Sequence, residues 1–165
     1  MKILAALFIL TILSLPAFAA ARIPPLNADA TVDRIIDGDT FVATLTLENG
    51  ARVGVRVRFM EIDAPELSGD CERERQMAQA SKVRLGEIVP IGSTVTLTEI
   101  KDDKYQGRIN AYVFVGDLDV GAKMIAENHA IPYGGGRRSP WCTDQEIAAE
   151  QKRVLLSIHN ANTIK

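Results

Sequence analysis

The sequence is poor in histidine and cysteine, with two of each among its 165 residues. His129 and His159 both fall at the end of a predicted helix, where we expect solvated side chains, so histidine-based catalysis is weakly supported. Neither cysteine has a partner at the ligand spacing of a zinc site, which argues against bound zinc. The sequence also lacks the Gly-x-Ser-x-Gly nucleophile elbow and the phosphate-binding P-loop.

An excess of basic charge is missing as well. The 19 Lys and Arg residues stand against 21 Asp and Glu, which gives a formal net charge of −2. Nucleic-acid-binding proteins are usually basic overall, so this balance counts against non-specific binding of polyanions. It leaves room for a local basic patch. We find no internal repeat and no low-complexity segment, and the length suits one domain with a proper core.

The first 21 residues differ from the rest of the chain. A charged start at Lys2 is followed by an almost wholly apolar run over residues 3–15 and by Pro16. Small residues then fit a cleavage site near Ala19–Ala21. This pattern predicts a signal peptide over residues 1–21 and a secreted or periplasmic protein with no membrane contact after cleavage. The alternative is an uncleaved membrane anchor, because the apolar run nearly reaches spanning length.

Beyond the signal peptide, we expect a flexible leader over residues 22–30 and a single domain over residues 31–165. Cys71 and Cys142 would then fold in an oxidising compartment, where an even count favours a disulfide over two free buried thiols. Closing a loop of this length stabilises a fold by roughly 4 kcal/mol through the entropy of the unfolded chain.

Apolar residues at alternating positions predict five strands, over residues 31–36, 40–47, 51–62, 93–100 and 108–115. Helical spacing predicts helices over residues 72–88 and 120–128, and a third after Thr143, which forms a capping-box pattern with Glu146. Five short strands with one helix after the third predict an OB-type barrel, a mainly β α+β fold with about three helices; an α+β sandwich is the alternative. The residues expected on the apolar helix faces are Met77, Ala80, Val83 and Ile88, then Ala122, Ile125 and Ala126, and finally Ile147, Val154, Leu155 and Ile158.

The strand predicted over residues 51–62 changes its pattern near its end. Up to Phe59, apolar residues alternate with polar positions rich in arginine, and then the alternation shifts by one residue. Such a shift indicates a bulge or a sharp bend near residues 59–61. In a regular strand Arg58 and Asp63 would face opposite ways, whereas a bend lets both point at one site.

Four carboxylates lie beside these strands, at Asp37, Asp39, Asp63 and Glu66. Calcium prefers oxygen ligands of this kind, together with backbone carbonyls. Ala64 precedes a proline, which holds its backbone extended and makes its carbonyl available to the same ion. An EF-hand is excluded because Phe41 occupies a required ligand position. Taken singly, an Asp-Gly pair is most often a turn, and an Asp-Ala-Pro-Glu segment is most often a solvated loop.

Three motifs taken together are far more specific. Residues 36–40 read Ile-Asp-Gly-Asp-Thr, Arg58 precedes the Asp-Ala-Pro-Glu segment at residues 63–66, and residues 103–108 read Asp-Lys-Tyr-Gln-Gly-Arg. In this order, with a predicted helix between the second and third, the chain resembles the staphylococcal-type thermonucleases over roughly residues 30–157. The resemblance implies an OB-type barrel and a Ca²⁺-dependent endonuclease that hydrolyses DNA and RNA with little base preference and leaves 3′-phosphates.

The resemblance also implies a calcium site. Asp39 and Asp63 would supply carboxylates, Ala64 would supply its backbone carbonyl, and Asp37 would be an outer-sphere acid. Alanine stands at position 64 where the family often has threonine, and a ligand that uses only its backbone tolerates this change.

Three further residues receive catalytic roles from the resemblance. Glu66 would be the general base or would position the attacking water. Arg58 and Arg108 would hold the phosphate and stabilise the charge that builds up on it, because a guanidinium fork matches two phosphate oxygens. Gln106 is an additional residue within the third motif.

Residues around the implied cleft are candidates for contacts with the substrate. We assign Lys104, Tyr105 and Tyr133 to phosphate or base contacts, since an aromatic ring stacks on any base. Arg137 and Arg138 are interpreted as solvated rather than as part of a phosphate-binding track. The predicted disulfide would tie together two loops that flank the cleft.

Two other functions remain as alternatives. One is a catalytically weak or inactive OB-type module that binds nucleic acid or protein, and the other is a calcium-stabilised extracytoplasmic domain. A degenerate binder is expected to lose its charged site residues first, and here all of them are present. We therefore favour a nuclease, and we expect it to be a monomer.

Overall fold

The computed structural model describes residues 27–47, 49–138 and 140–163, with side chains described as far as residue 158. The predicted signal peptide, residues 1–21, and most of the predicted leader lie outside the described residues. The end of the leader was predicted wrongly, because the first strand already begins at Ala28 and pairs with its neighbours on both sides. Ala30 is buried in the core.

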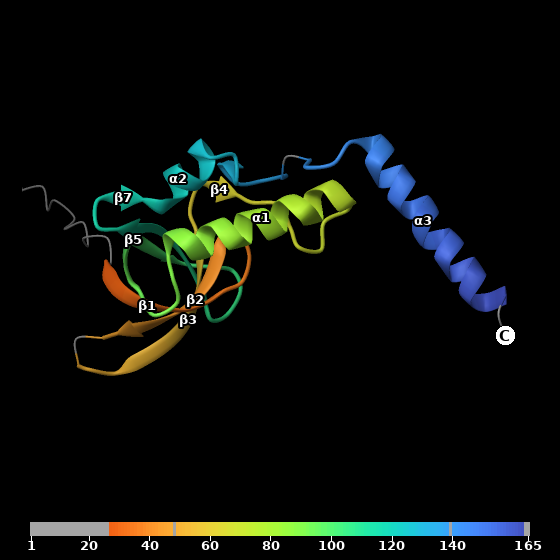
Figure 1. The fold of residues 1–165 in the computed structure, drawn as a ribbon. Helices are drawn as coiled ribbons and strands as arrows, with labels where there is room; N and C mark the ends of the chain where they lie inside the picture. The colour runs from red at the N-terminus through yellow and green to blue at the C-terminus, as the bar shows by residue number, and fades with distance from the viewer. Residues whose placement is uncertain (1–26, 48, 139, 164–165) are drawn as a thin grey trace, which may run out of the picture.

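Five strands close into a barrel, as predicted (Figure 1). They run in the spatial order β3-β2-β1-β5-β6, and β6 pairs in parallel with β3 to complete the closure, while the other pairs are antiparallel. Closure joins residues 56–59 of β3 to residues 108–111 of β6, which covers part of the sheet edge on each strand. The barrel strands are β1 (Ala28–Ile35), β2 (Thr40–Thr46), β3 (Arg52–Phe59), β5 (Thr94–Asp102) and β6 (Arg108–Val115).

The barrel interior is apolar and is covered by two helices. Phe41 of β2 and Phe59 of β3 pack edge to face, with ring centroids 5.8 Å apart. Leu85 and Met124, one from each covering helix, are fully buried in the same core. Burial of each such side chain contributes about 1.5–3 kcal/mol relative to exposure, so this core is a main source of the stability of the barrel.

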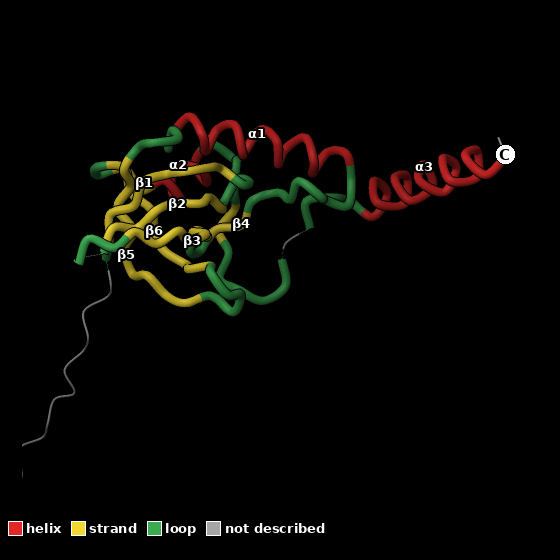
Figure 2. The backbone as a smooth tube through the Cα atoms, turned by 90° about the horizontal axis from the view of Figure 1, so that it is seen from below, coloured by secondary structure: helices red, strands yellow, loops and turns green. Residues whose placement is uncertain are grey.

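The described residues contain three helices, close to their predicted positions. They are α1 (Glu72–Ile88), α2 (Val120–Ala126) and α3 (Asp144–Thr163). The predicted capping box is confirmed, because the Thr143 amide donates to Glu146 Oε2 at 2.7 Å and the Glu146 amide donates to Thr143 Oγ1 at 3.3 Å. Figure 2 shows α1 lying across the barrel and α3 leading away from it. None of the helices in the described part of the chain has the length and apolar character needed to cross a membrane.

The predicted apolar faces of the first two helices were right only in part, since Ile88 and Ile125 pack against the core but other members of these faces do not. Val83 of α1 is 52% exposed, whereas the buried face of this helix includes Glu74 and Ser81. These polar side chains are buried because they bond to neighbouring loops; Ser81 Oγ, for example, donates to the carbonyl of His129 at 2.8 Å. The full buried sets are Glu74, Ala78, Ser81 and Leu85 in α1, and Val120, Gly121 and Met124 in α2.

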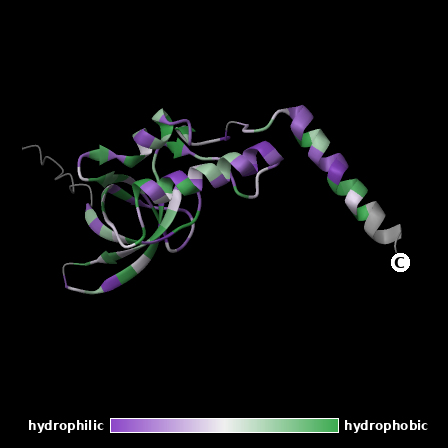
Figure 3. Ribbon diagram, viewed as in Figure 1, coloured by the Kyte–Doolittle hydropathy of each residue, from purple (hydrophilic) through white to green (hydrophobic). Residues whose placement is uncertain are grey.

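The third helix carries no buried stripe over residues 144–158, whose side chains the structure describes. Val154, Leu155 and Ile158 are 47%, 67% and 52% exposed, and Figure 3 shows apolar and polar residues mixed along α3. The first half of α3 is tied to α1 by ion pairs, including Arg73 to Glu146 at 2.8 Å. The stripe predicted from helical spacing is therefore present in the sequence but has no partner surface among the described residues.

The predicted bend after β3 is confirmed. The strand ends at Phe59, and Glu61 adopts a left-handed backbone with φ of 60°. The chain then forms β4 (Ile62–Asp63), which pairs with β8 (Ile131–Pro132) in a separate two-stranded sheet. A short β7 (Leu118–Asp119) extends the edge of β6. The bend turns Asp63 back toward the arginine that precedes it.

Candidate active site

The turn between β1 and β2 delivers Asp39 to the site. Asp37 Oδ1 accepts a hydrogen bond from the Asp39 amide at 3.1 Å, which is the arrangement of an Asx-turn. A Cβ atom on Gly38 would lie 2.6 Å from Cβ of Ser81 and 2.8 Å from Cβ of Ala64. Only glycine fits at this position, because the turn packs directly against α1 and the Ala64 segment.

Asp39 is almost completely buried and fully engaged. Its Oδ1 accepts from Arg58 Nη1 at 2.5 Å and from Thr40 Oγ1 at 2.9 Å. Its Oδ2 accepts from the Ala64 amide at 2.9 Å. The carboxylate therefore joins the β1–β2 turn to the segment that follows the bend.

Burial also affects the neighbouring acid. Burial, and then the negative charges of Asp39 and Glu66, raise the pKa of Asp37 to about 6. Asp37 is held close to two other acidic groups, and a bound cation would offset the repulsion between them.

Asp63 is fully buried and receives three donors. Its Oδ1 accepts from Arg138 Nε at 2.7 Å and lies 3.5 Å from Arg58 Nη2. Its Oδ2 accepts from the indole Nε1 of Trp141 at 3.2 Å. The structure thus brings Arg58 and Asp63 together, as the predicted bend requires.

Arg138 is the main residue that the sequence interpretation missed. It was interpreted as solvated, but its guanidinium lies inside the site. Besides Asp63, it donates from Nη1 to Glu66 Oε1 at 2.6 Å and from Nη2 to the Ala64 carbonyl at 2.6 Å. The one signal in the sequence was the predicted disulfide, since a bridge at Cys142 brings this segment next to the loop that follows Glu66.

That disulfide is present. Cys71 and Cys142 are bonded, with Cα atoms 6.0 Å apart. Cys71 is also the N-cap of α1, and Cys142 directly follows Trp141. The bridge therefore ties the segment that carries Arg138 to the loop that precedes α1.

A buried carboxylate holds the Glu66 loop in place. Glu74 of α1 accepts from the Glu66 amide at 3.2 Å and from the Asp70 amide at 3.1 Å. A Cβ on Gly69 would lie 2.4 Å from Glu74 Cδ, so the loop needs glycine where it passes this side chain. Glu74 thus positions the backbone of the proposed base, and nothing in the local sequence distinguishes it from an exposed helix acid.

Arg108 lies apart from the carboxylates and belongs to a second cluster. It donates from Nη2 to Asp103 Oδ1 at 3.1 Å, and its guanidinium carbon lies 4.5 Å from the centre of the Tyr105 ring. Its Nε is buried without a hydrogen-bond partner among the described residues. Burial alone would raise the pKa of Asp103, but hydrogen bonds from Arg108, the Tyr105 amide and Asn110 lower it below its usual value.

Strand register explains this separation. Arg58 on β3 is paired with Asn110 on β6, and Arg108 is paired with Arg56. Arg108 therefore lies two residues before Asn110, the residue that pairs with Arg58. Two residues of a strand span roughly 6–7 Å. The Arg108 guanidinium is on the same outer side of the barrel but contacts its own hairpin.

A groove of about 360 Å³ begins at Arg58. Lys101 and Asn110 line it from the β5–β6 side, and Tyr133 lines it from the loop after β8. The Tyr133 hydroxyl donates to the Gly136 carbonyl at 2.7 Å, which orients the ring. Of the three candidates for substrate contact, Tyr133 lines this groove, whereas Lys104 packs over Tyr105 at the exposed hairpin tip.

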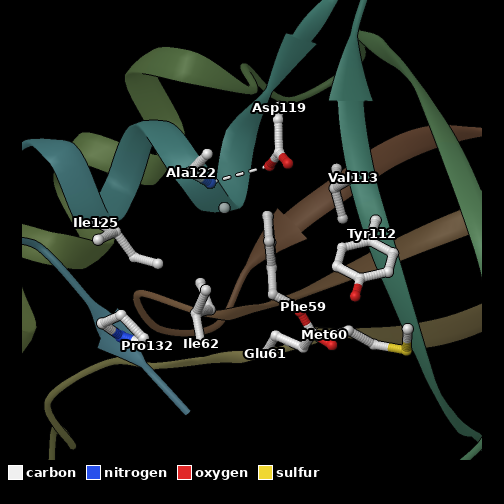
Figure 4. Close-up of a pocket in the computed structure, with 11 residues that line it drawn as sticks. Phe59, Met60, Glu61, Ile62, Tyr112, Val113, Asp119, Ala122, Ile125 and Pro132 are labelled. Carbon is white, nitrogen blue, oxygen red and sulfur yellow. Dashed lines mark hydrogen bonds between the residues drawn. The ribbon is translucent and has the colours of Figure 1, made fainter. Parts of the chain in front are cut away.

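A second pocket, of about 220 Å³, lies between the bend and α2 (Figure 4). Its lining includes Glu61, Tyr112 and Asp119, and a hydrogen bond with Glu61 raises the pKa of Tyr112 to about 12. Asp119 caps α2 by accepting from the Ala122 amide at 2.9 Å. None of the residues assigned to catalysis or metal binding lines this pocket, so the groove at Arg58 is the candidate site.

The donor set fits a hard cation. Oxygen atoms of Asp63, Ala64 and Glu66 all face one positively charged group, the guanidinium of Arg138. Carboxylate and carbonyl oxygens are the ligands that calcium prefers. Among the described residues, however, no three acidic, histidine or cysteine side chains are already grouped as a metal site.

Fold and site together define an OB-type barrel with an acidic and guanidinium cluster beside an open groove. The chain matches the family described as "Staphylococcal nuclease homologue" over residues 56–155. It is 34% identical over 138 residues to an "Uncharacterized endonuclease" of Escherichia coli, covering 81% of this chain and 82% of that protein. A similarly described protein of Escherichia coli O157:H7 is 33% identical over the same length and shares. The chain belongs to the staphylococcal nuclease family, and nucleic acid is the substrate class of that family.

Proposed function

We propose that this protein is a secreted or periplasmic, calcium-dependent endonuclease. It hydrolyses phosphodiester bonds of DNA and RNA with little base specificity and leaves 3′-phosphates. The observation that carries the proposal is the meeting of Asp39 and Asp63 at Arg58, the arginine that also lines the groove. Membership of a nuclease family supports it.

The proposed calcium ligands are the carboxylates of Asp39 and Asp63 and the backbone carbonyl of Ala64, with Asp37 in the outer sphere. When bound, calcium neutralises and polarises the phosphoryl group. The raised pKa of Asp37 supports this assignment, because the acid sits where negative charge is in excess.

Glu66 is the proposed general base. Its side chain is 45% exposed, so water reaches it, while Glu74 fixes its backbone. A base placed in this way contributes about 10²–10⁴-fold to the rate. Water attacks phosphorus and gives its proton to Glu66 while the bond from phosphorus to the 5′ oxygen breaks, and the 5′ oxygen takes up a proton. The phosphate stays on the 3′ oxygen.

Arg58 and Arg108 are the proposed phosphate-binding residues. The Arg58 side chain is 20% exposed and lines the groove, while its Nη1 donates to Asp39 and its Nη2 lies 3.5 Å from Asp63. Preorganised cations of this kind, aimed at developing charge, are usually a large part of catalysis. Arg108 now forms an ion pair with Asp103. It takes the same role when a phosphate of the substrate replaces Asp103 as its partner.

A second candidate function is a catalytically weak or inactive module that binds nucleic acid or protein. Two contacts favour it. Arg138 donates hydrogen bonds to two of the proposed calcium ligands, and Arg108 forms an ion pair with Asp103. In that protein the ion pairs would be permanent.

The deciding experiment is cleavage of plasmid DNA and of single-stranded RNA by the disulfide-bonded protein, with calcium and with a calcium chelator. We expect cleavage only with calcium, and 3′ ends that a polymerase extends only after phosphatase treatment. Asp63→Asn should abolish cleavage, while Asp117→Asn, in an exposed turn, should not. A calcium-induced rise in melting temperature without cleavage would support the non-catalytic alternatives instead.

The proposed location is tested separately. Fractionation of the producing cells should place the protein outside the cytoplasm, and its N-terminal sequence should begin close to residue 20 or 22. A cytoplasmic protein that retains residue 1 would contradict the signal peptide.

A further inference from the structure

Arg138 contacts the same oxygens that the proposed function assigns to calcium and to the base. Three of its nitrogens donate, one each to Asp63 Oδ1, the Ala64 carbonyl and Glu66 Oε1, over 2.6–2.7 Å. Such short charge-assisted hydrogen bonds are among the stronger contacts available in a protein. The guanidinium is thus fitted to the site and is not simply near it.

Two contacts on the C-terminal side of this arginine hold its segment in place. Trp141, three residues further on, donates to the second oxygen of the same Asp63 carboxylate at 3.2 Å. Cys142 follows and is bonded to Cys71 at the start of α1. Two anchors therefore fix the segment that carries Arg138, which distinguishes it from an exposed loop that meets an acid by chance.

Calcium and this guanidinium compete for the same positions. Calcium needs six to eight oxygens at about 2.3–2.6 Å. Two of the proposed ligand oxygens, Asp63 Oδ1 and the Ala64 carbonyl, already accept hydrogen bonds from Arg138. The four carboxylates of the site (Asp37, Asp39, Asp63 and Glu66) outnumber the two guanidinium groups that pair with them, those of Arg58 and Arg138.

We propose that Arg138 is the resident counter-cation of the calcium site and that calcium binds only when Arg138 leaves. The inference rests on the proposed function, because it takes its calcium ligands from there. The apparent dissociation constant for calcium is then the intrinsic constant divided by the fraction of molecules in which Arg138 has left the ligands. In the absence of metal, Arg138 compensates the buried carboxylate of Asp63 and the partly exposed carboxylate of Glu66. It also sets the calcium concentration at which the site is filled.

The test is calorimetric titration of calcium into the protein without nucleic acid. Arg138→Ala should lower the dissociation constant for calcium at least tenfold, and Arg138→Lys, which keeps the charge but makes fewer contacts, should fall between Arg138→Ala and wild type. Arg137→Ala is the matched control, because it removes the same charge from the neighbouring exposed position; its dissociation constant should equal that of wild type. The inference is overturned if Arg138→Ala binds calcium no tighter than wild type, or if Arg137→Ala gains as much.

A second readout does not depend on how well the alanine variant folds. Trp141 is the only tryptophan of the chain and donates to Asp63, so its fluorescence should follow calcium binding in the wild type and in Arg138→Lys, with a lower midpoint in the variant. Equal midpoints would overturn the inference. If calcium binds equally to all variants, only this inference fails; if it binds to none of them, the calcium assignment in the proposed function fails with it.

Discussion

Arg58 Nη1 donates to Asp39 Oδ1 at 2.5 Å, and this contact joins two segments 19 residues apart. It follows from strand register, because Arg58 on β3 pairs with Thr40 on β2, the residue after Asp39. The acid is 4% exposed and the arginine 20% exposed. The carboxylate therefore orients the guanidinium from the buried side, and Nη2 of the same group lies 3.5 Å from Asp63.

Arg58→Lys tests the value of that geometry. Lysine keeps the charge and can still pair with Asp39, but it loses the planar fork that matches two phosphate oxygens. We expect the single-turnover cleavage rate to fall by about 10²–10³-fold, with little change in melting temperature. An unchanged rate would rule out the bidentate role.

Glu66→Gln separates proton transfer from metal binding. The amide cannot accept the proton of water, so turnover should fall by about 10²–10⁴-fold. Calcium binding should survive, because the proposed ligands Asp39, Asp63 and the Ala64 carbonyl are untouched. The cleavage rate and the calcium affinity, measured on the same preparation, check the two expectations. Near-full activity would show that the base has been assigned wrongly.

Local signals in the sequence were sufficient for the barrel and for part of the site. The shift of alternation after Phe59 predicts the bend, and the Asp37-Gly38 turn predicts where Asp39 is presented. These signals work because turn geometry and strand alternation depend on neighbouring residues. The bend alone is enough to predict that Arg58 and Asp63 share one site.

The residues that were missed depend on contacts between distant segments. Arg138 meets Glu66 across 72 residues of sequence, and an arginine that follows three glycines and another arginine carries no local mark of burial. Glu74 is buried because two loop amides need an acceptor, so helical periodicity of apolar residues could not reveal it. The position of Arg108 depends on the register between β6 and β3. The additional Gln106 in the turn before β6 does not indicate that register.

Removal of the disulfide should destabilise the whole domain. The bridge closes a loop with a sequence separation of 71 residues, and loss of such a constraint costs roughly 4 kcal/mol. Replacement of both Cys71 and Cys142 by serine should lower the free energy of unfolding by that amount in urea denaturation. Wild type measured with a reductant should approach the double variant. Identical unfolding curves with and without reductant would contradict a stabilising bridge.

Stability in acid should depend on the ion pairs between α1 and α2. Hydrogen bonds from Arg84 and then Lys123 lower the pKa of Glu127 from 4.5 to about 2, and the Arg84 Nε to Glu127 Oε2 distance is 2.7 Å. Because the pKa is lower in the folded than in the unfolded protein, this carboxylate stabilises the fold above about pH 4.5, and the contribution is lost as the pH falls toward 2. Glu127→Gln should therefore be less stable than wild type at pH 7 and should lose less stability between pH 5 and pH 2. Glu99→Gln, at an exposed position on β5, is the control and should follow the wild-type profile in thermal unfolding. Parallel pH profiles for Glu127→Gln and wild type would show that the pair contributes nothing, since removing a carboxylate with an altered pKa must change the slope.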